Sequence, residues 1–142
     1  ISLGLVGSEM CIRDRYMDGG LADSIPIEYA LEKGNDKIVV VLTRNPGYRK
    51  KRALKATEQL YKRAYKKYPN LVRAIMTRNA VYNRQMKLIE KLEEEGKIFV
   101  IRPLIPTVSR MEKDYDKLQH FYMHGNRLMK KEYQGLLEYL NE

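Results

Sequence analysis

The sequence predicts an α/β fold, and two apolar runs carry this prediction. Residues 37–43, KIVVVLT, form a continuous run rich in β-branched side chains, which is typical of a strand buried on both faces of a parallel sheet. Residues 97–102, KIFVIR, form a second strand that Pro103 ends. Helical patterns precede and follow each run, so we expect a parallel sheet whose strands are joined by helices.

Residues 16–43 are predicted to form one βαβ unit. Residues 16–17 end a first strand, and Asp18-Gly19-Gly20 follows as a turn in which glycine permits backbone angles that other residues avoid. A helix over residues 26–33 begins with a proline, which suits a first helical turn, and Gly34 ends it. The run at 37–43 then supplies the second strand.

Residues 44–142 are predicted to be mainly helical, with one strand near residues 97–102. We expect helices over about 53–67, 70–77 and 78–95, the last of which Gly96 ends, and a long amphipathic helix over about 115–140 with Gly125 as a weak point. The apolar stripe of this long helix consists of Leu118, Phe121, Tyr122, Leu128, Met129, Leu136, Leu137 and Leu140. The helix over 78–95 has an apolar face and a basic face. The apolar face carries Val81, Leu88, Ile89 and Leu92, and the basic face carries Arg84, Lys87 and Lys91.

Residues 1–15, ISLGLVGSEMCIRDR, differ from the rest of the chain. They show no hydrophobic period of 2 or 3.6 residues, and they resemble a peptide that arises when sequencing adapters are translated. We therefore expect this segment not to be native to the protein. The alternative is a short strand over residues 2–6 followed by a loop.

Size and composition favour one folded domain. The chain has 142 residues, of which 44% are apolar, and its longest apolar run covers only residues 38–42. The first residues do not show the basic segment and the following apolar segment that are typical of a secretory signal. The single cysteine, Cys11, excludes an internal disulfide framework. We therefore expect a cytoplasmic protein.

The positive charge is concentrated in one part of the chain. Residues 44–91 contain 15 Lys or Arg and two acidic residues, within a chain of net charge +9. Such a field favours an anionic partner, although a solvated helical face would have the same composition. The basic tract after the strand predicted at residues 37–43 could attract acidic lipid headgroups or simply promote solubility. Its basic residues are Arg44, Arg49, Lys50, Lys51 and Arg52.

Two other groups of residues have weaker functional interpretations. Tyr61, Tyr65 and Tyr68 alternate with basic residues, but this spacing is more typical of helix packing, so we expect no nucleic-acid partner. His120 and His124 share a helical face at the spacing of a metal-binding pair, but no third ligand accompanies them. We expect neither a metal nor another cofactor.

Asp18 is the leading candidate for chemistry. A carboxylate that follows a strand of an open α/β sheet lies where such folds place their sites, and the two glycines after it leave it uncrowded. It could accept a proton from a nucleophile or orient a base. The alternative is a structural aspartate that forms an Asx-turn.

Residues 16–43 resemble the C-terminal half of the patatin-like phospholipase catalytic domain, through YMDGGLADSIPIEYAL, Gly34 and KIVVVLT. The resemblance implies a three-layer α/β/α hydrolase in which an aspartate and a serine form a dyad that hydrolyses lipid acyl esters. Asp18 matches the dyad aspartate, and Gly19 and Gly20 match the small residues after it. VVVLTRNPGYRKK, YKKYPNLVRAIMTRNAVYNRQMKLIEKLEEEGKIFVIRP and VSRMEKD further resemble a bacterial, cytoplasmic branch with a helical C-terminal extension. Residues 44–142 would be that extension.

The sequence departs from the family pattern in one important respect. No G-x-S-x-G motif is present, and the serines are Ser2, Ser8, Ser24 and Ser109. An aspartate without its serine cannot form an acyl-enzyme. We therefore expect a C-terminal fragment of a serine hydrolase that is inactive alone. Two alternatives remain, a non-catalytic basic module that binds an anionic membrane or RNA, and a structural domain that has lost catalysis.

Overall fold

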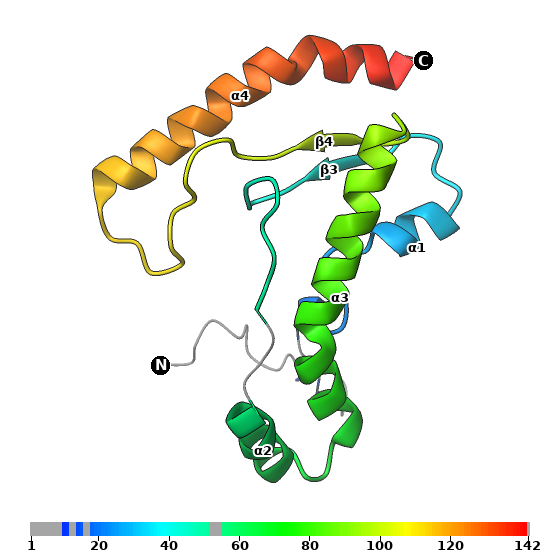
Figure 1. The fold of residues 1–142 in the computed structure, drawn as a ribbon, viewed down its shortest axis with the longest axis vertical. Coiled ribbons are helices and arrows are strands. Elements are labelled where there is room, and N and C mark those ends of the chain that lie inside the picture. The colour runs from blue at the N-terminus through cyan, green and yellow to red at the C-terminus, as the bar shows by residue number, and fades with distance from the viewer. Residues whose placement is uncertain (1–9, 12–13, 16–17, 52–54, 142) are drawn as a thin grey trace. The chain divides into compact units, whose positions relative to one another are not determined.

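The computed structural model describes residues 10–11, 14–15, 18–51 and 55–141. The strands predicted at residues 2–6 and 16–17 lie outside this range. The chain divides into two compact units, one of residues 1–29 and 50–87 and the other of residues 30–49 and 88–142. Figure 1 shows the elements in chain order.

The first unit is mostly helical. It contains a short antiparallel pair, β1 (Met10–Cys11) and β2 (Asp14–Arg15), and the 3-10 turn η1 (Gly19–Leu21). It also contains α2 (Lys55–Ala64) and residues 69–87 of α3 (Pro69–Glu94). Its buried apolar side chains are Leu21, Ile27, Val72, Tyr82 and Met86.

Helix α3 is one continuous helix of 26 residues, so the prediction of two helices that meet at residues 77 and 78 was wrong. Neither Thr77 nor Arg78 breaks a helix. The Thr77 hydroxyl donates to the carbonyl oxygen of Arg73 at 2.9 Å, which satisfies this polar group within the helix. Thr77 and Arg78 are therefore polar residues on the side of α3 and do not end the helix.

The two predicted faces of α3 are largely confirmed. Ile89 and Leu92 are buried, whereas Arg84, Lys87 and Lys91 are exposed. The centre of the buried face differs from the prediction, because Val81 and Leu88 are only partly buried. Tyr82, Gln85 and Met86 are buried instead.

Gly96 ends α3 with a left-handed backbone conformation, at φ 68°. Its amide donates to the carbonyl of Glu93 at 3.0 Å, and the amide of Lys97 donates to the carbonyl of Leu92 at 2.9 Å. This pair of bonds is a Schellman motif, which satisfies carbonyls that a helix end leaves without partners. The predicted helix stop at this glycine is confirmed.

The second unit contains the predicted parallel strand pair. Strand β3 (Val39–Val41) pairs with β4 (Phe99–Ile101), and Val40 lies opposite Val100. The amide of Leu42 extends the ladder by donating to the carbonyl of Ile101 at 2.8 Å. The chain therefore combines helices with a small two-stranded parallel sheet.

The prediction that both faces of the strand at residues 37–43, which is β3, are buried was wrong. Val40 and Leu42 are buried, but Val39 and Val41 on the opposite face are 39% and 69% exposed. Successive side chains of a strand point to opposite faces, and among the described residues only β4 pairs with β3. An apolar strand face is thus left in contact with solvent.

The predicted long C-terminal helix is confirmed as α4 (Tyr115–Asn141), and it continues through Gly125. The Asp114 carboxylate accepts the amides of Asp116 and Lys117 at 3.1 and 3.2 Å and so caps this helix. The Lys117 amide, above all, holds the pKa of Asp114 below its usual value. Within the described ranges, no helix combines the length and apolar character that crossing a bilayer requires.

Tyr139 anchors α4 to the chain around the sheet. Its hydroxyl accepts the amide of Ile38 at 3.0 Å and lies 3.0 Å from the carbonyl oxygen of Lys97. Its ring lies 5.8 Å from that of Phe99 on β4, centroid to centroid. Tyr139 is the buried residue of α4. Of the predicted apolar stripe, Leu118, Tyr122 and Leu140 are exposed, and Phe121, Leu128, Met129, Leu136 and Leu137 are partly buried.

The short helix predicted over residues 26–33 is confirmed as α1 (Ile27–Glu32). Gly34 follows it at φ 69°, and its amide donates to the carbonyl of Leu31 at 3.0 Å, so the predicted stop is confirmed.

Candidate functional site

Asp18 lies at the start of the 3-10 turn η1, as an exposed residue. Its Oδ1 accepts the amide of Gly20 at 2.8 Å. This bond forms an Asx-turn, which was the structural alternative for Asp18, and it uses one of the two carboxylate oxygens. Among the described residues, Oδ2 has no hydrogen-bond partner. The carboxylate is therefore fixed through one oxygen and can accept a proton through the other.

The sequence predicted two roles for the glycines after Asp18, permissive backbone angles and an uncrowded carboxylate, and only the second is confirmed, at Gly20. Neither has a positive φ, so the turn does not need glycine for its backbone angles. At Gly20 a Cβ would lie 3.2 Å from Asp18 Oδ1, closer than a comfortable contact. At Gly19 a Cβ would meet no atom within 4 Å. Gly20 thus makes room for the carboxylate, whereas Gly19 is not sterically required.

Two side chains of α3 contact the segment that follows the turn. Arg78 Nε lies 3.5 Å from Ser24 Oγ, at the limit of a hydrogen bond. The Gln85 amide donates to Asp23 Oδ1, which also accepts the amide of Ile25 at 3.2 Å. These residues belong to the same unit as Asp18. They fix the segment on α3.

Gln85 is the most completely buried polar side chain of this group, at 1% exposure. Its nitrogen is bonded to Asp23, but its Oε1 has no hydrogen-bond donor among the described residues. A buried polar atom without a partner lowers the stability of the fold. Packing alone therefore does not explain why Gln85 lies beside the turn that carries Asp18.

Ser24 is close to the turn but is not oriented as the nucleophile of a dyad. Its hydroxyl donates to the carbonyl oxygen of Gly20 at 2.9 Å. A nucleophilic serine would instead direct its hydroxyl hydrogen to the base. Ser24 therefore acts as a structural link in this segment.

The sequence did not indicate Asp23, Arg78 or Gln85 as members of the site. Arg78 and Ser24 are 54 positions apart, and Gln85 and Asp23 are 62 positions apart. No local spacing connects such residues. The only available signal was a glutamine at position 85 on the helix face that also carries Tyr82 and Ile89.

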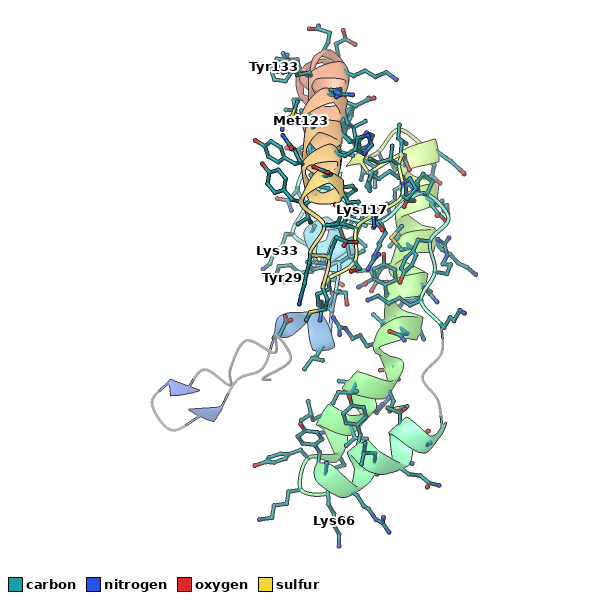
Figure 2. All side chains as sticks on the ribbon, turned by 90° about the vertical axis from the view of Figure 1, so that its left-hand side faces the viewer. Tyr29, Lys33, Lys66, Lys117, Met123 and Tyr133 are labelled. Carbon is teal, nitrogen blue, oxygen red and sulfur yellow. The ribbon has the colours of Figure 1, made fainter. Side chains whose placement is uncertain are left out.

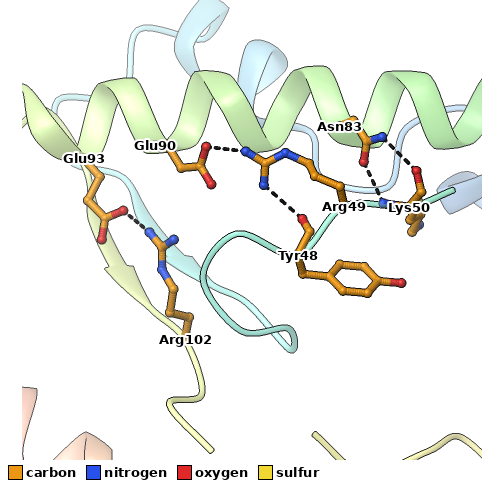
Figure 3. Close-up of polar contacts among 7 residues, drawn as sticks. All are labelled: Tyr48, Arg49, Lys50, Asn83, Glu90, Glu93 and Arg102. Carbon is orange, nitrogen blue, oxygen red and sulfur yellow. Dashed lines mark hydrogen bonds and ion pairs between the residues drawn. The ribbon is translucent and has the colours of Figure 1, made fainter. Parts of the chain in front are cut away.

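The predicted basic tract is divided between the two units, and Figure 3 shows part of it. In the second unit, Arg49 forms an ion pair with Glu90 and donates to the carbonyl of Tyr48 at 2.9 Å. Arg44 donates to Thr107 Oγ1 at 3.0 Å and lies over the Tyr48 ring. Both guanidinium groups are thus engaged in contacts within the protein.

In the first unit, the Asn83 side chain bonds both the amide and the carbonyl of Lys50, each at 2.9 Å (Figure 3). The Lys50 ammonium lies 4.0 Å from the centre of the Tyr82 ring. Asn79 donates to the carbonyl of Lys51 at 2.7 Å. Arg52 lies outside the described residues. Much of the tract therefore has a structural role.

The loop after β3 is held to the chain after β4. The Asn45 amide donates to the carbonyls of Pro103 and Ile105, at 3.1 and 2.7 Å. Nearby in the sequence, Arg102 forms an ion pair with Glu93 (Figure 3), and burial lowers the pKa of Arg102. These contacts stabilise the second unit and leave little free charge on this loop.

The two histidines lie on α4, as predicted. His124 Nε2 accepts the amide of Leu104 at 3.1 Å, so this nitrogen already has a backbone partner. His120 is exposed. Over the part of the chain that the structure describes, no three His, Cys, Asp or Glu side chains are grouped as metal ligands.

Residues 68–141 match the domain of unknown function DUF6363. The chain belongs to the DUF6363 family. The DUF6363 segment includes α3, β4 and α4, and therefore Arg78 and Gln85, but not the turn at Asp18. Searches of curated proteins and of solved structures found no match.

Proposed function

We propose that this chain is the C-terminal part of a patatin-like serine acyl hydrolase of the bacterial cytoplasm, with Asp18 as the dyad aspartate. The observation that carries the proposal is the Asp18 carboxylate, which is exposed, fixed through Oδ1 and without a described partner at Oδ2. A base that accepts a proton from a serine needs this combination of fixed position and accessible oxygen.

The proposed reaction is the hydrolysis of a lipid acyl ester. Asp18 accepts the hydroxyl proton of a serine that this chain does not supply, and the serine oxygen attacks the ester carbonyl. Asp18 returns this proton to the leaving alcohol. It then takes a proton from the water that attacks the acyl group and gives it to the serine oxygen as the acid is released. The proposed mechanism uses no metal or cofactor.

The sheet gives further support. Parallel sheets are rarely open to solvent, because helical connections cover both faces. Here β3 has one parallel neighbour among the described residues, and its Val39 and Val41 are exposed. A helical layer, as in a three-layer α/β/α hydrolase, would cover this apolar face, and additional strands would extend the sheet at its edges.

The experiment compares this chain with the product of the complete reading frame. A serine-reactive fluorophosphonate probe should label the longer product and leave residues 1–142 unlabelled, because these residues contain no G-x-S-x-G motif and Ser24 directs its hydroxyl to Gly20. The labelled serine should lie in a G-x-S-x-G motif. A complete reading frame without such a motif would exclude the dyad.

A second candidate function is supported by the hairpin of α2 and α3. A cavity of about 500 Å³ lies there, with Val72 and Met76 among its apolar lining and Lys62, Lys66 and Arg73 among its basic lining. Lys66 projects from the end of this hairpin (Figure 2). Glu58 also lines the cavity and forms an ion pair with Lys62 at 2.8 Å. The surface suits a non-catalytic module that binds an anionic membrane through Lys66 and Arg73, rather than through Lys62, Arg44 and Arg49, which have partners within the protein.

This second function predicts salt-dependent binding to vesicles that contain phosphatidylglycerol. The combined change Lys66→Glu and Arg73→Glu should reduce binding at least tenfold, since each basic residue near an anionic surface contributes about 1 kcal/mol. Asp18→Ala should leave binding unchanged. Binding that is insensitive to salt, or preference for RNA over vesicles in a competition assay, would contradict the membrane function.

A further inference from the structure

Arg78 brings a positive charge to the turn that carries Asp18. Its Nη2 lies 3.8 Å from the position that a Cβ on Gly20 would take, and Asp18 Oδ1 lies 3.2 Å from the same point. The guanidinium and the carboxylate therefore flank one glycine. They do not form an ion pair with each other.

Arg78 forms no ion pair within the described part of the protein. Its only hydrogen bond there is the long one from Nε to Ser24 Oγ. Arg84, on the same helix, differs, because it forms an ion pair with Glu28 at 2.9 Å. Arg78 is also partly buried, and a partly desolvated guanidinium with free N–H groups binds an anion favourably.

The surroundings hold Arg78 and the turn in a defined geometry. Ser24 links the Arg78 Nε to the carbonyl of Gly20, and the buried Gln85 holds Asp23 one position before Ser24. Glycine at position 20 places no side chain between its backbone and Nη2. The Nη groups of Arg78 have no hydrogen-bond partner among the described residues, so they can donate to an anion.

We propose that Arg78 binds a phosphate group next to Asp18. Two parallel N–H groups of a guanidinium match two phosphate oxygens, which a single lysine ammonium cannot reproduce. The binding of phosphate requires no catalysis. Only its assignment to the substrate depends on the proposed function, in which the ester to be cleaved would carry this phosphate near the dyad.

The test uses the 142-residue chain labelled with ¹⁵N. Inorganic phosphate and, in a separate titration, dihexanoyl phosphatidylglycerol below its micelle concentration are added at constant ionic strength. Phosphate should shift the amide resonances of Gly19 and Gly20 and the Nε–H resonance of Arg78. Binding of both probes identifies a lipid headgroup as a possible source, and binding of inorganic phosphate alone identifies a free phosphate; either result supports the site.

Variants distinguish a specific site from general attraction to a basic protein. Arg78→Gln should weaken phosphate binding about tenfold or more, and Arg78→Lys should restore it only in part. Arg84→Gln removes the same charge from the same helix and should change the dissociation constant less than twofold. Amide spectra that are unchanged away from the substituted residue would show that each variant is folded.

Three results would overturn the proposal. Phosphate could leave Gly19 and Gly20 unshifted, or Arg84→Gln could weaken binding as strongly as Arg78→Gln. Arg78→Gln could also leave phosphate binding unchanged, in which case Arg78 would serve only to hold Ser24. A failure of the hydrolase function would appear in the fluorophosphonate experiment and would leave these titrations unaffected.

Discussion

Replacement of Asp18 by Asn should greatly slow the reaction of the complete reading-frame product with a fluorophosphonate probe. The amide keeps the size of the side chain and an oxygen that can accept the Gly20 amide, so the turn should persist. It cannot accept a proton from serine at neutral pH. Loss of a general base lowers rates by roughly 10²–10⁴-fold, and we expect the second-order labelling rate to fall within this range.

Two matched controls separate chemistry from folding. Asp36→Asn changes another exposed aspartate and should leave the labelling rate unchanged. Gly20→Ala should lower the rate, because the added Cβ lies 3.2 Å from Asp18 Oδ1 and the carboxylate must move. Gly19→Ala, where a Cβ meets no atom within 4 Å, should have little effect. Labelling of Asp18→Asn at the normal rate would contradict the role of Asp18.

Local signals in the sequence were sufficient for most of the described elements. The β-branched run gave β3, and Gly34 and Gly96 correctly marked helix ends because each adopts a left-handed conformation. The division of α3 into two helices failed because polar residues at the helix surface were interpreted as an interruption. Helix propensity at Thr77 and Arg78 is sufficient to continue a helix whose next turns are buried.

Burial was harder to predict than secondary structure. A β-branched run is compatible with one or two buried faces, and the number of neighbouring elements decides between them. On α4, the 3.6-residue pattern identified the helix but missed Tyr139, its buried residue. The burial of Tyr139 depends on polar groups at Ile38 and Lys97, which are remote in sequence.

The candidate site was predicted only in part, for a similar reason. Asp18, Gly19 and Gly20 are consecutive, so their pattern is visible in the sequence. Arg78 and Gln85 reach this segment from α3 through contacts that span more than 50 positions. Composition also overestimated the free charge of the basic tract, because Arg44 and Arg49 have partners within the second unit.

Replacement of Tyr139 by Ala should cause the largest loss of stability of any single change in α4. The substitution removes a buried aromatic ring that contacts Phe99, and it leaves the Ile38 amide and the Lys97 carbonyl without their shared partner. Truncation of a buried aromatic side chain costs about 3–5 kcal/mol. We expect a loss in this range in urea unfolding followed by circular dichroism.

Two further variants assign this loss to its causes. Tyr139→Phe keeps the ring and removes the hydroxyl, so it should cost about 1–3 kcal/mol, the penalty for leaving buried polar groups unpaired. Tyr133→Ala changes a tyrosine of the same helix (Figure 2). Tyr133 is 55% exposed, so this substitution should change stability by less than about 0.5 kcal/mol. Comparison of the three variants separates packing, hydrogen bonding and helix propensity.

Amide hydrogen exchange can show which part of the second unit loses stability when Tyr139 is changed. The Ile38 amide donates to the Tyr139 hydroxyl, and the Phe99 amide donates to the Ile38 carbonyl, so Tyr139 lies next to the start of the β3–β4 ladder. Tyr139→Phe should therefore accelerate exchange at Ile38 more than at Val40, whose position in the ladder does not involve the hydroxyl. Equal acceleration throughout the second unit, or equal stability of Tyr139→Ala and Tyr133→Ala, would show that α4 is not anchored at this residue.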